Sequence, residues 1–129
     1  MIDPEEISEI LADERIEFVM DEDQDGTRWL IIHALGLISL ELSATGEFLQ
    51  FRTGPIADPT GLSPDERGEL YRRAMQANDR HTIGRYCGTE QIDFEIGMAF
   101  PGDATLSPEQ MMLGIRTVAA IACARELAF

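Results

Sequence analysis

The sequence predicts an α+β fold, in which an antiparallel sheet of five to six strands is accompanied by helices at the N-terminus, in the middle and at the C-terminus. Three observations support this prediction. One helix-start pattern, an apolar residue followed by a cap residue and a proline, occurs three times. Between these starts, apolar and polar residues alternate with the period of a strand, and short turn sequences separate the strands. The expected order is α-β-β-β(-β)-α-β-β-α.

Length and composition indicate one domain, residues 1–129, because 129 residues with 44% hydrophobic content can bury a core without disulfides. The net charge of −14 repels nucleic acid and anionic membranes, so neither is an expected partner. All ten basic residues are arginines, which excludes lysine-based catalysis. Two cysteines 36 positions apart favour reduced thiols, and no apolar run is long enough to span a membrane. We therefore expect a cytoplasmic protein.

The first 25 residues carry eleven acidic side chains against one arginine, a local charge of −10. Within them Ile2-Asp-Pro-Glu-Glu-Ile7 predicts a short helix, whose Ile7, Ile10 and Leu11 form a narrow apolar stripe. The acids are expected to stay in solvent.

The next segment predicts strands joined by tight turns. Alternation from Arg15 onward predicts the first strand, and Asp23-Gln-Asp-Gly26 predicts a turn. Residues 29–34 are apolar on both faces, as is typical of a central strand. Residues 38–42 and 48–53 then predict a hairpin around Ala44-Thr-Gly46.

After the breaker-rich loop 54–61, Leu62-Ser-Pro begins a middle helix. Its expected buried face comprises Leu70, Tyr71, Ala74, Met75 and Asn78. Its other face carries Arg67, Arg72, Arg73 and Glu69. These arginines could bind an acidic or phosphorylated partner, but we expect them to pair within the chain, as Arg72 can with Glu69.

A second hairpin is predicted by residues 83–87, a turn at Gly88-Thr-Glu-Gln91, and residues 92–100. Its second strand has the cleanest alternation in the chain. One face holds Ile92, Phe94, Ile96, Met98 and Phe100.

The last helix begins at Leu106-Ser-Pro-Glu-Gln and is apolar on two sides. One stripe is expected to pack on the chain's own sheet: Met111, Ile115, Val118 and Ala122. The other is expected to form a surface for a second copy or a protein partner: Leu113, Ala120, Ala124 and Leu127. The two sides could be exchanged. Alternatively, the first helix covers the second stripe within the same chain.

The same element order, together with four stretches, resembles the YbjN-type sensory-transduction regulators, which share the fold of type III secretion chaperones. These stretches are the strand at 48–53, the helix end Ala77-Asn-Asp-Arg80, the hairpin at 83–100 and the helix start at 106–110. None is a catalytic motif. The resemblance implies a chaperone-like fold without a defined biochemical activity. Type III chaperones are small, acidic, usually dimeric proteins that bind extended segments of secreted partners.

Asp21-Glu-Asp-Gln-Asp-Gly26 matches the beginning of an EF-hand calcium loop, but the twelfth position is Ile32 rather than glutamate. We expect a hairpin turn there and no metal. The alternative is a calcium- or metal-responsive sensor that uses Asp21, Asp23 and Asp25.

The remaining candidates for chemistry lack the spacing of a ligand set or a nucleophile–base pair. They are His33, His81, Cys87 and Cys123. We expect Glu41, Asp93 and Glu95 to lie on solvated strand faces. The sequence therefore predicts no cofactor and no catalysis, with a small enzyme as a further alternative. The expected function is that of a homodimeric, non-enzymatic protein-interaction module, chaperone-like or regulatory, whose partner is another, unidentified protein.

Overall fold

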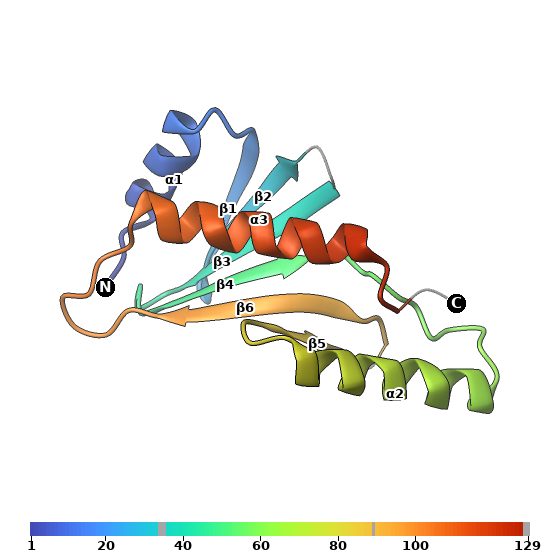
Figure 1. The fold of residues 1–129 in the computed structure, drawn as a ribbon. Coiled ribbons are helices and arrows are strands. Elements are labelled where there is room, and N and C mark those ends of the chain that lie inside the picture. Colours follow the sequence, from blue (N-terminus) through green and yellow to red (C-terminus); the bar gives the residue numbers. More distant parts are fainter. Residues whose placement is uncertain (34–35, 89, 128–129) are drawn as a thin grey trace.

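The computed structural model describes residues 1–33, 36–88 and 90–127, and the order of its elements confirms the predicted fold class (Figure 1). The sequence prediction had left open whether four or three strands precede the middle helix, and there are four. The elements are α1 (Pro4–Asp13), β1 (Phe18–Asp23), β2 (Gly26–His33), β3 (Gly36–Ser43), β4 (Phe48–Thr53), α2 (Pro64–Arg80), β5 (Arg85–Cys87), β6 (Asp93–Ala99) and α3 (Pro108–Ala124).

The strands form one antiparallel sheet in the order β1-β2-β3-β4-β6-β5. The first four strands follow one another as hairpins, and β6 then pairs with β4, so that β5 lies at the far edge. Both predicted hairpins, β3–β4 and β5–β6, are confirmed. Residue 34, the last of the stretch predicted as a central strand, residue 35 after it, and Thr89, in the predicted second turn, lie outside the described residues.

Each helix begins where its cap predicts, because the cap side chain satisfies a backbone N–H that has no partner inside the helix. Asp3 accepts a hydrogen bond from the Glu5 N–H at the start of α1. Ser63 in α2 and Ser107 in α3 each form a complete capping box with the residue three positions later. Local sequence therefore determines these three boundaries.

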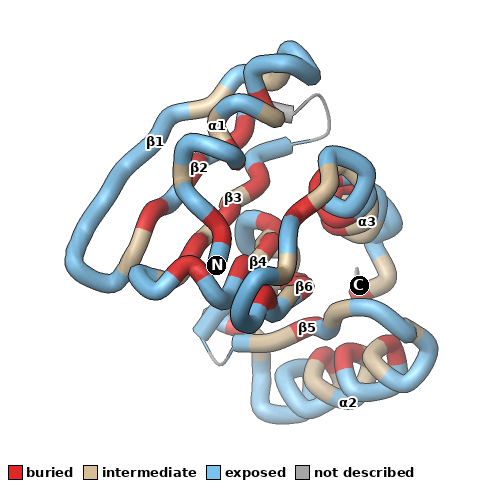
Figure 2. The backbone as a smooth tube through the Cα atoms, turned by 90° about the vertical axis from the view of Figure 1, so that its left-hand side faces the viewer, coloured by how far each residue is buried: buried red, intermediate tan, exposed pale blue. Residues whose placement is uncertain are grey.

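Helices α1 and α3 lie on one face of the sheet, and α2 lies at its β5 edge, where Asn78 bonds the open backbone of Tyr86 (Figures 1 and 2). Helix α1 lies over β1 and β2, α3 contacts β3, β4 and β6, and α2 lies along β5. Every second strand residue points toward these helices, and Trp29, Leu40, Phe51 and Phe94 are fully buried there. Burying an apolar side chain contributes about 1.5–3 kcal/mol. The other face of the sheet has no cover among the described residues.

The expectation that residues 29–34 are buried on both faces is therefore wrong. Strand β2 is second from the edge, and its Leu30 and Ile32 point to the uncovered face and remain exposed. The apolar pattern correctly indicated side chains that favour burial, but nothing in the described chain buries them.

The expected buried face of α2 needs one further correction. Leu70 and Ala74 are buried as expected, but Ala77 takes the third position and Met75 is among the most exposed apolar residues of the chain. The reason is that α2 rests on β5, an edge strand of only three residues, which buries a narrower stripe than the sequence prediction assumed.

Among the described helices, none combines the length and apolarity needed to cross a membrane.

Candidate interaction surfaces

The first stripe of α3 packs on the sheet as predicted. Met111, Ile115 and Val118 are fully buried, and Ala122, one turn later, is half-buried. This side of α3 contacts β3, β4 and β6. The stripe is core and is not available to a partner.

Three residues of the second stripe lie on the outer side of α3, as predicted. Leu113 is 52% exposed, and Ala120 and Ala124 are exposed as well. Helix α1 does not cover them, since its Ile7 and Leu11 are buried in the core. We call Leu113, Ala120 and Ala124 the α3 surface.

Leu127 does not belong to this surface, because it is buried in the chain's own core, with 2% exposure. Helix α3 ends at Ala124, and Arg125 adopts a left-handed conformation with φ 54°, which turns the chain away from the helix axis. Glu126 then pairs with Arg80 at 3.2 Å and with His81 at 2.9 Å, both at the end of α2. The helical periodicity that assigned Leu127 to the stripe no longer applies there.

A second apolar surface, which the sequence analysis did not identify, lies on the uncovered face of the sheet. Its four aliphatic side chains are between 38% and 62% exposed. We call them the sheet patch: Val19, Leu30, Ile32 and Leu37. The signal was present in the two-sided apolar pattern of β2, but the sequence alone could not distinguish a covered face from an uncovered one.

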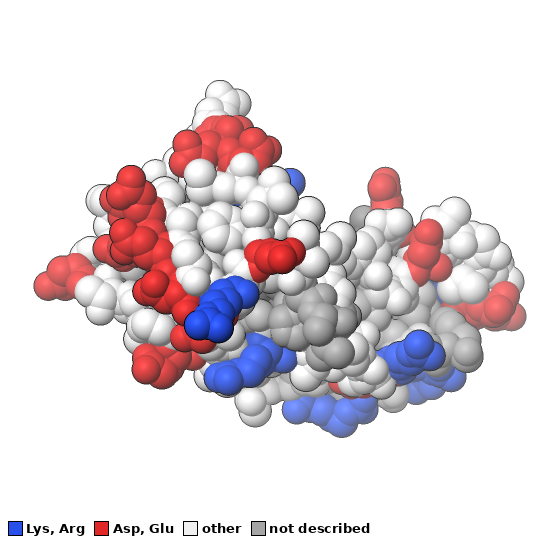
Figure 3. Space-filling model, turned by 90° about the horizontal axis from the view of Figure 1, so that it is seen from above, with Lys and Arg blue, Asp and Glu red and all other residues white. Residues whose placement is uncertain are grey.

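Acidic side chains are concentrated on the α1 side of the molecule. Figure 3 shows carboxylates gathered on the left of the view, on the side where α1 lies in Figure 1, and arginines mainly toward the lower edge. This distribution follows from the local charge of −10 in residues 1–25. The surface around α1 and β1 therefore attracts cationic groups and repels anionic ones.

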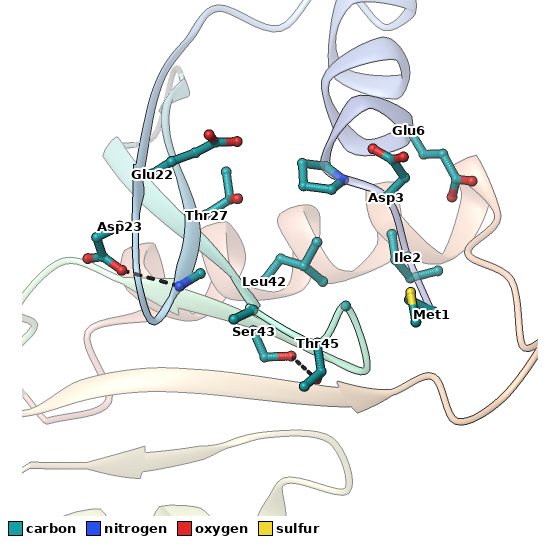
Figure 4. A pocket seen from close by; sticks show the side chains of 14 residues that line it. Met1, Ile2, Asp3, Glu6, Glu22, Asp23, Thr27, Leu42, Ser43 and Thr45 are labelled. Carbon is teal, nitrogen blue, oxygen red and sulfur yellow. Dashed lines mark hydrogen bonds between the residues drawn. The ribbon is translucent and has the colours of Figure 1, made fainter.

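A hollow with a volume of about 560 Å³ lies between α1 and the β1–β2 and β3–β4 turns (Figure 4). Glu22 and Asp23 lie on one side of it, and Asp3 and Glu6 on the other, with Leu42 between them. Asp3 caps α1 and Asp23 holds a turn. Two of the four carboxylates thus already serve the fold.

The acidic turn forms as predicted. The Oδ1 atom of Asp23 accepts hydrogen bonds from the backbone N–H groups of Asp25 at 2.8 Å and Gly26 at 3.2 Å. This is the local bonding for which turns favour aspartate. The hollow lined by Asp21, Asp23 and Asp25 is also lined by Arg28, whose guanidinium binds Glu41 at 3.1 Å. A cationic side chain therefore already borders these carboxylates, which disfavours the metal-sensor alternative.

On the uncovered face, Cys87, Asp93 and Glu95 lie close together. Their possible metal-ligand atoms are within 4.8 Å of one another, which makes them the candidate metal site of the described residues. Arg52 occupies this group, at 3.6 Å from Asp93 and 3.2 Å from Glu95, and Arg85 reaches Glu95 at 3.5 Å. The carboxylates outweigh the effect of desolvation and raise the pKa of Arg52.

This ion-pair network corrects one sequence expectation and confirms another. Asp93 lies on the uncovered face as expected, but Glu95 is buried, since two arginines lie against its carboxylate. Burial, together with hydrogen bonding to Asp93, raises the pKa of the Cys87 thiol to about 12. The thiol stays protonated at neutral pH, which suits neither a metal ligand nor a nucleophile.

The other candidate side chains do not converge on this cluster. His81, at the end of α2, packs edge-on against Phe94 and Tyr86, with ring centroids 5.2 and 5.9 Å away. Cys123 lies on α3, and the His33 side chain lies outside the described part of the structure. Burial, followed by the charge of Glu126, raises the pKa of Tyr86 to about 12.

The arginines of α2 pair within the chain, as expected. Arg72 Nε donates to Glu69 at 2.9 Å, and Arg73 Nε donates to the same carboxylate at 3.2 Å. The hydrogen bond from Arg72 is the main cause that lowers the pKa of Glu69. Helix α2 therefore offers an acidic partner fewer uncommitted cations than its sequence suggests.

A comparison with known protein families finds a match that covers nearly the whole chain. The YbjN family model, described as "putative bacterial sensory transduction regulator", matches residues 3–125. The matched stretch contains every helix and strand named above. No curated protein matches the chain. The likeness therefore concerns the fold as a whole, and it includes both α3 and the uncovered sheet face.

Proposed function

The chain belongs to the YbjN family, and from this membership we propose that it is a non-enzymatic protein-interaction module with a regulatory or chaperone-like role. We propose that it acts as a homodimer, that the α3 surface forms the contact between the two copies, and that the dimer binds a further protein. The proposal places this activity in the cytoplasm, since Cys87 and Cys123 lie in separate elements and are not joined by a disulfide.

The observation that supports the dimer is the exposed apolar side of α3. Leu113, Ala120 and Ala124 lie on the outer side of a helix whose opposite side is core, and Thr117 continues the stripe with its hydroxyl bonded to the Leu113 carbonyl at 2.7 Å. Small side chains allow the backbone of a second helix to approach closely. A helix of this kind on each copy gives an isologous contact, the commonest arrangement in homodimers.

The chemistry of the side chains supports a non-enzymatic role. Cys87 carries a protonated thiol, and its neighbours Asp93 and Glu95 are paired with Arg52 and Arg85. His81 is bound to Glu126 and packed between aromatic rings. Each of these groups is engaged in holding the fold.

The test compares two charge insertions on opposite sides of α3. Ala120→Glu should leave a folded monomer. Within one copy the new carboxylate lies in solvent, so the fold survives, whereas in the dimer it would face the same carboxylate of the second copy and repel it. Ile115→Glu should unfold the chain, because it buries an unpaired charge. Light scattering measures the mass and circular dichroism measures the fold. Gln76→Glu on the exposed side of α2 adds the same charge and should keep the dimer. A wild type that is monomeric at high concentration would refute the dimer.

A further inference from the structure

We propose that the uncovered face of the sheet binds an amphipathic helix of another protein, through an apolar stripe on that helix and arginine or lysine side chains beside it. The binding surface consists of the sheet patch and the carboxylates along β1. It lies on the face opposite to α3. The inference goes beyond the proposed dimer contact and does not depend on it.

The strand register makes the patch continuous. Val19 of β1 lies directly opposite Leu30 of β2, and Ile32 of β2 lies directly opposite Leu37 of β3. Directly opposed side chains in an antiparallel pair are about 4.5–5.5 Å apart at Cβ. Leu30 and Ile32 are two positions apart on one strand and so share a face. The four side chains thus form one exposed aliphatic group, which a monomeric chain seldom leaves in water.

The width of this group fits a helix. It spans three neighbouring strands, a distance of about 10 Å at the usual strand spacing. A helix with its side chains is about 10–12 Å across, whereas an extended segment covers about one strand spacing. The opposite face of the same sheet is covered in this way by α1 and α3. A helix on the uncovered face would complete a third layer.

The charges around the patch specify the chemistry of that helix. Along the outer border of the patch, Glu17, Asp21 and Asp23 occupy every second position together with Val19, so they point to the same face. The backbone carbonyl of Glu17 accepts a hydrogen bond from the Ile32 N–H at 3.1 Å, which continues the pairing with β2. Among the ion pairs of the described residues, none engages these three carboxylates. Glu17 and Asp21 are therefore available to arginine or lysine on a partner, whereas Asp23 Oδ1 already accepts backbone N–H groups of the turn and contributes its charge.

Arg28 of β2 lies beside the patch, but its charge is offset by Glu41 at 3.1 Å. The same carboxylates argue against a second copy as the occupant. Two copies facing each other through this surface would bring Glu17, Asp21 and Asp23 of each chain close to those of the other, and like charges in an interface suppress association. Charge complementarity thus favours a basic partner helix.

Three fluorescent peptides of about 18 residues, long enough to form a helix, test the proposal against the intact chain. The first has a leucine stripe with arginines beside it, the second has glutamate in place of each arginine, and the third has serine in place of each leucine. Fluorescence anisotropy should show the first peptide binding at least about tenfold more tightly than either of the others. Equal binding of the serine peptide would overturn the proposal, because net charge alone would explain it. So would a failure of the first peptide to bind.

Substitutions then locate the site. Ile32→Thr and Val19→Thr remove apolar surface and keep β-branched side chains suited to strands, so the fold should survive and the affinity should fall about tenfold. Ile83→Thr is the matched control, since it is the same substitution at a residue of similar exposure, 48% against 54% for Ile32, outside both the sheet patch and the α3 surface, and it should leave binding unchanged. Unchanged affinity in both strand variants overturns the proposal.

Two further readouts separate this proposal from the dimer. If light scattering shows that Ile32→Thr turns a wild-type dimer into a monomer, a second copy covers the patch and the proposal is overturned. If Ala120→Glu leaves the oligomeric state unchanged, the proposed dimer contact is refuted. The first peptide should still bind to that variant.

Discussion

The aromatic ring of Phe51 in β4 lies directly beneath Gly114 of α3. A Cβ atom at position 114 would lie 2.7–2.9 Å from three carbons of that ring, closer than side chains tolerate. The missing side chain therefore allows α3 to lie close to the sheet. The glycine is needed for this close packing and not for an unusual backbone conformation, because its φ is that of an ordinary helix.

Gly114→Ala should accordingly destabilise the chain by about 1–3 kcal/mol, the usual result of overpacking, although alanine favours helices more than glycine does. Urea unfolding measures the change. Gly68→Ala in α2 is the control, because a Cβ there meets nothing within 4 Å. That variant should gain about 0.5–1 kcal/mol. Equal effects at the two positions would contradict the packing account.

Ser8 attaches α1 to the sheet. Its hydroxyl accepts a hydrogen bond from the Trp29 indole N–H at 3.0 Å, and Trp29 is completely buried. Ser8→Ala leaves that donor without its acceptor and should cost about 1–3 kcal/mol. Ser8→Thr keeps a hydroxyl and should cost less. Trp29 is the chain's one tryptophan, so its fluorescence reports directly on the docking of α1. An Ser8→Ala variant with wild-type stability would show that water replaces the hydroxyl.

Leu127 and Leu113 form a natural pair for mutation, since both were expected on one surface and only one is exposed. Leu127→Ala should lower the free energy of unfolding by about 2–5 kcal/mol, as is usual for a buried leucine. At a concentration low enough that the proposed dimer has dissociated, Leu113→Ala should change it by less than about 0.5 kcal/mol. Thermal or urea unfolding checks both values. A small effect at Leu127 would mean that the segment after α3 does not hold its place in solution.

Alkaline pH should destabilise the chain through Cys87. Its pKa is raised to about 12 in the folded state, against an ordinary value of 9.0. Between these values the unfolded chain loses the proton first, so the free energy of unfolding should fall as pH rises from about 9 toward 12. Cys87→Ala should show a smaller fall over the range, measured by urea unfolding. Cys123→Ala removes the other thiol, which is exposed on α3, and serves as the control.

The parts of the fold that could be predicted are those that local sequence determines. A serine or aspartate cap before a proline satisfies the first N–H groups of a helix wherever that helix packs, so all three helix starts were predicted correctly. The strict alternation around Phe94 likewise assigned the buried face of β6 without any knowledge of its neighbours.

The errors arose where the outcome depends on distant parts of the chain. Arg125 ends α3 in a left-handed conformation, which is uncommon for arginine, so no residue type announced that Leu127 would turn inward. The apolar pattern of Leu30 and Ile32 shows what these side chains favour, but it does not show whether the cover is part of the same chain. The sheet patch could only be recognised once the helices had been placed.

Helix α3 is synthesised after every strand that it covers. At about 5–20 residues per second, roughly 4–14 s separate the completion of β4 from that of α3. During this interval the growing chain presents Leu40, Leu49 and Phe51 without the helix that later buries them. A ribosome that stalls before α3 emerges therefore leaves an aggregation-prone intermediate, and the rate of translation through the last quarter of the message influences how much of the protein reaches its native state.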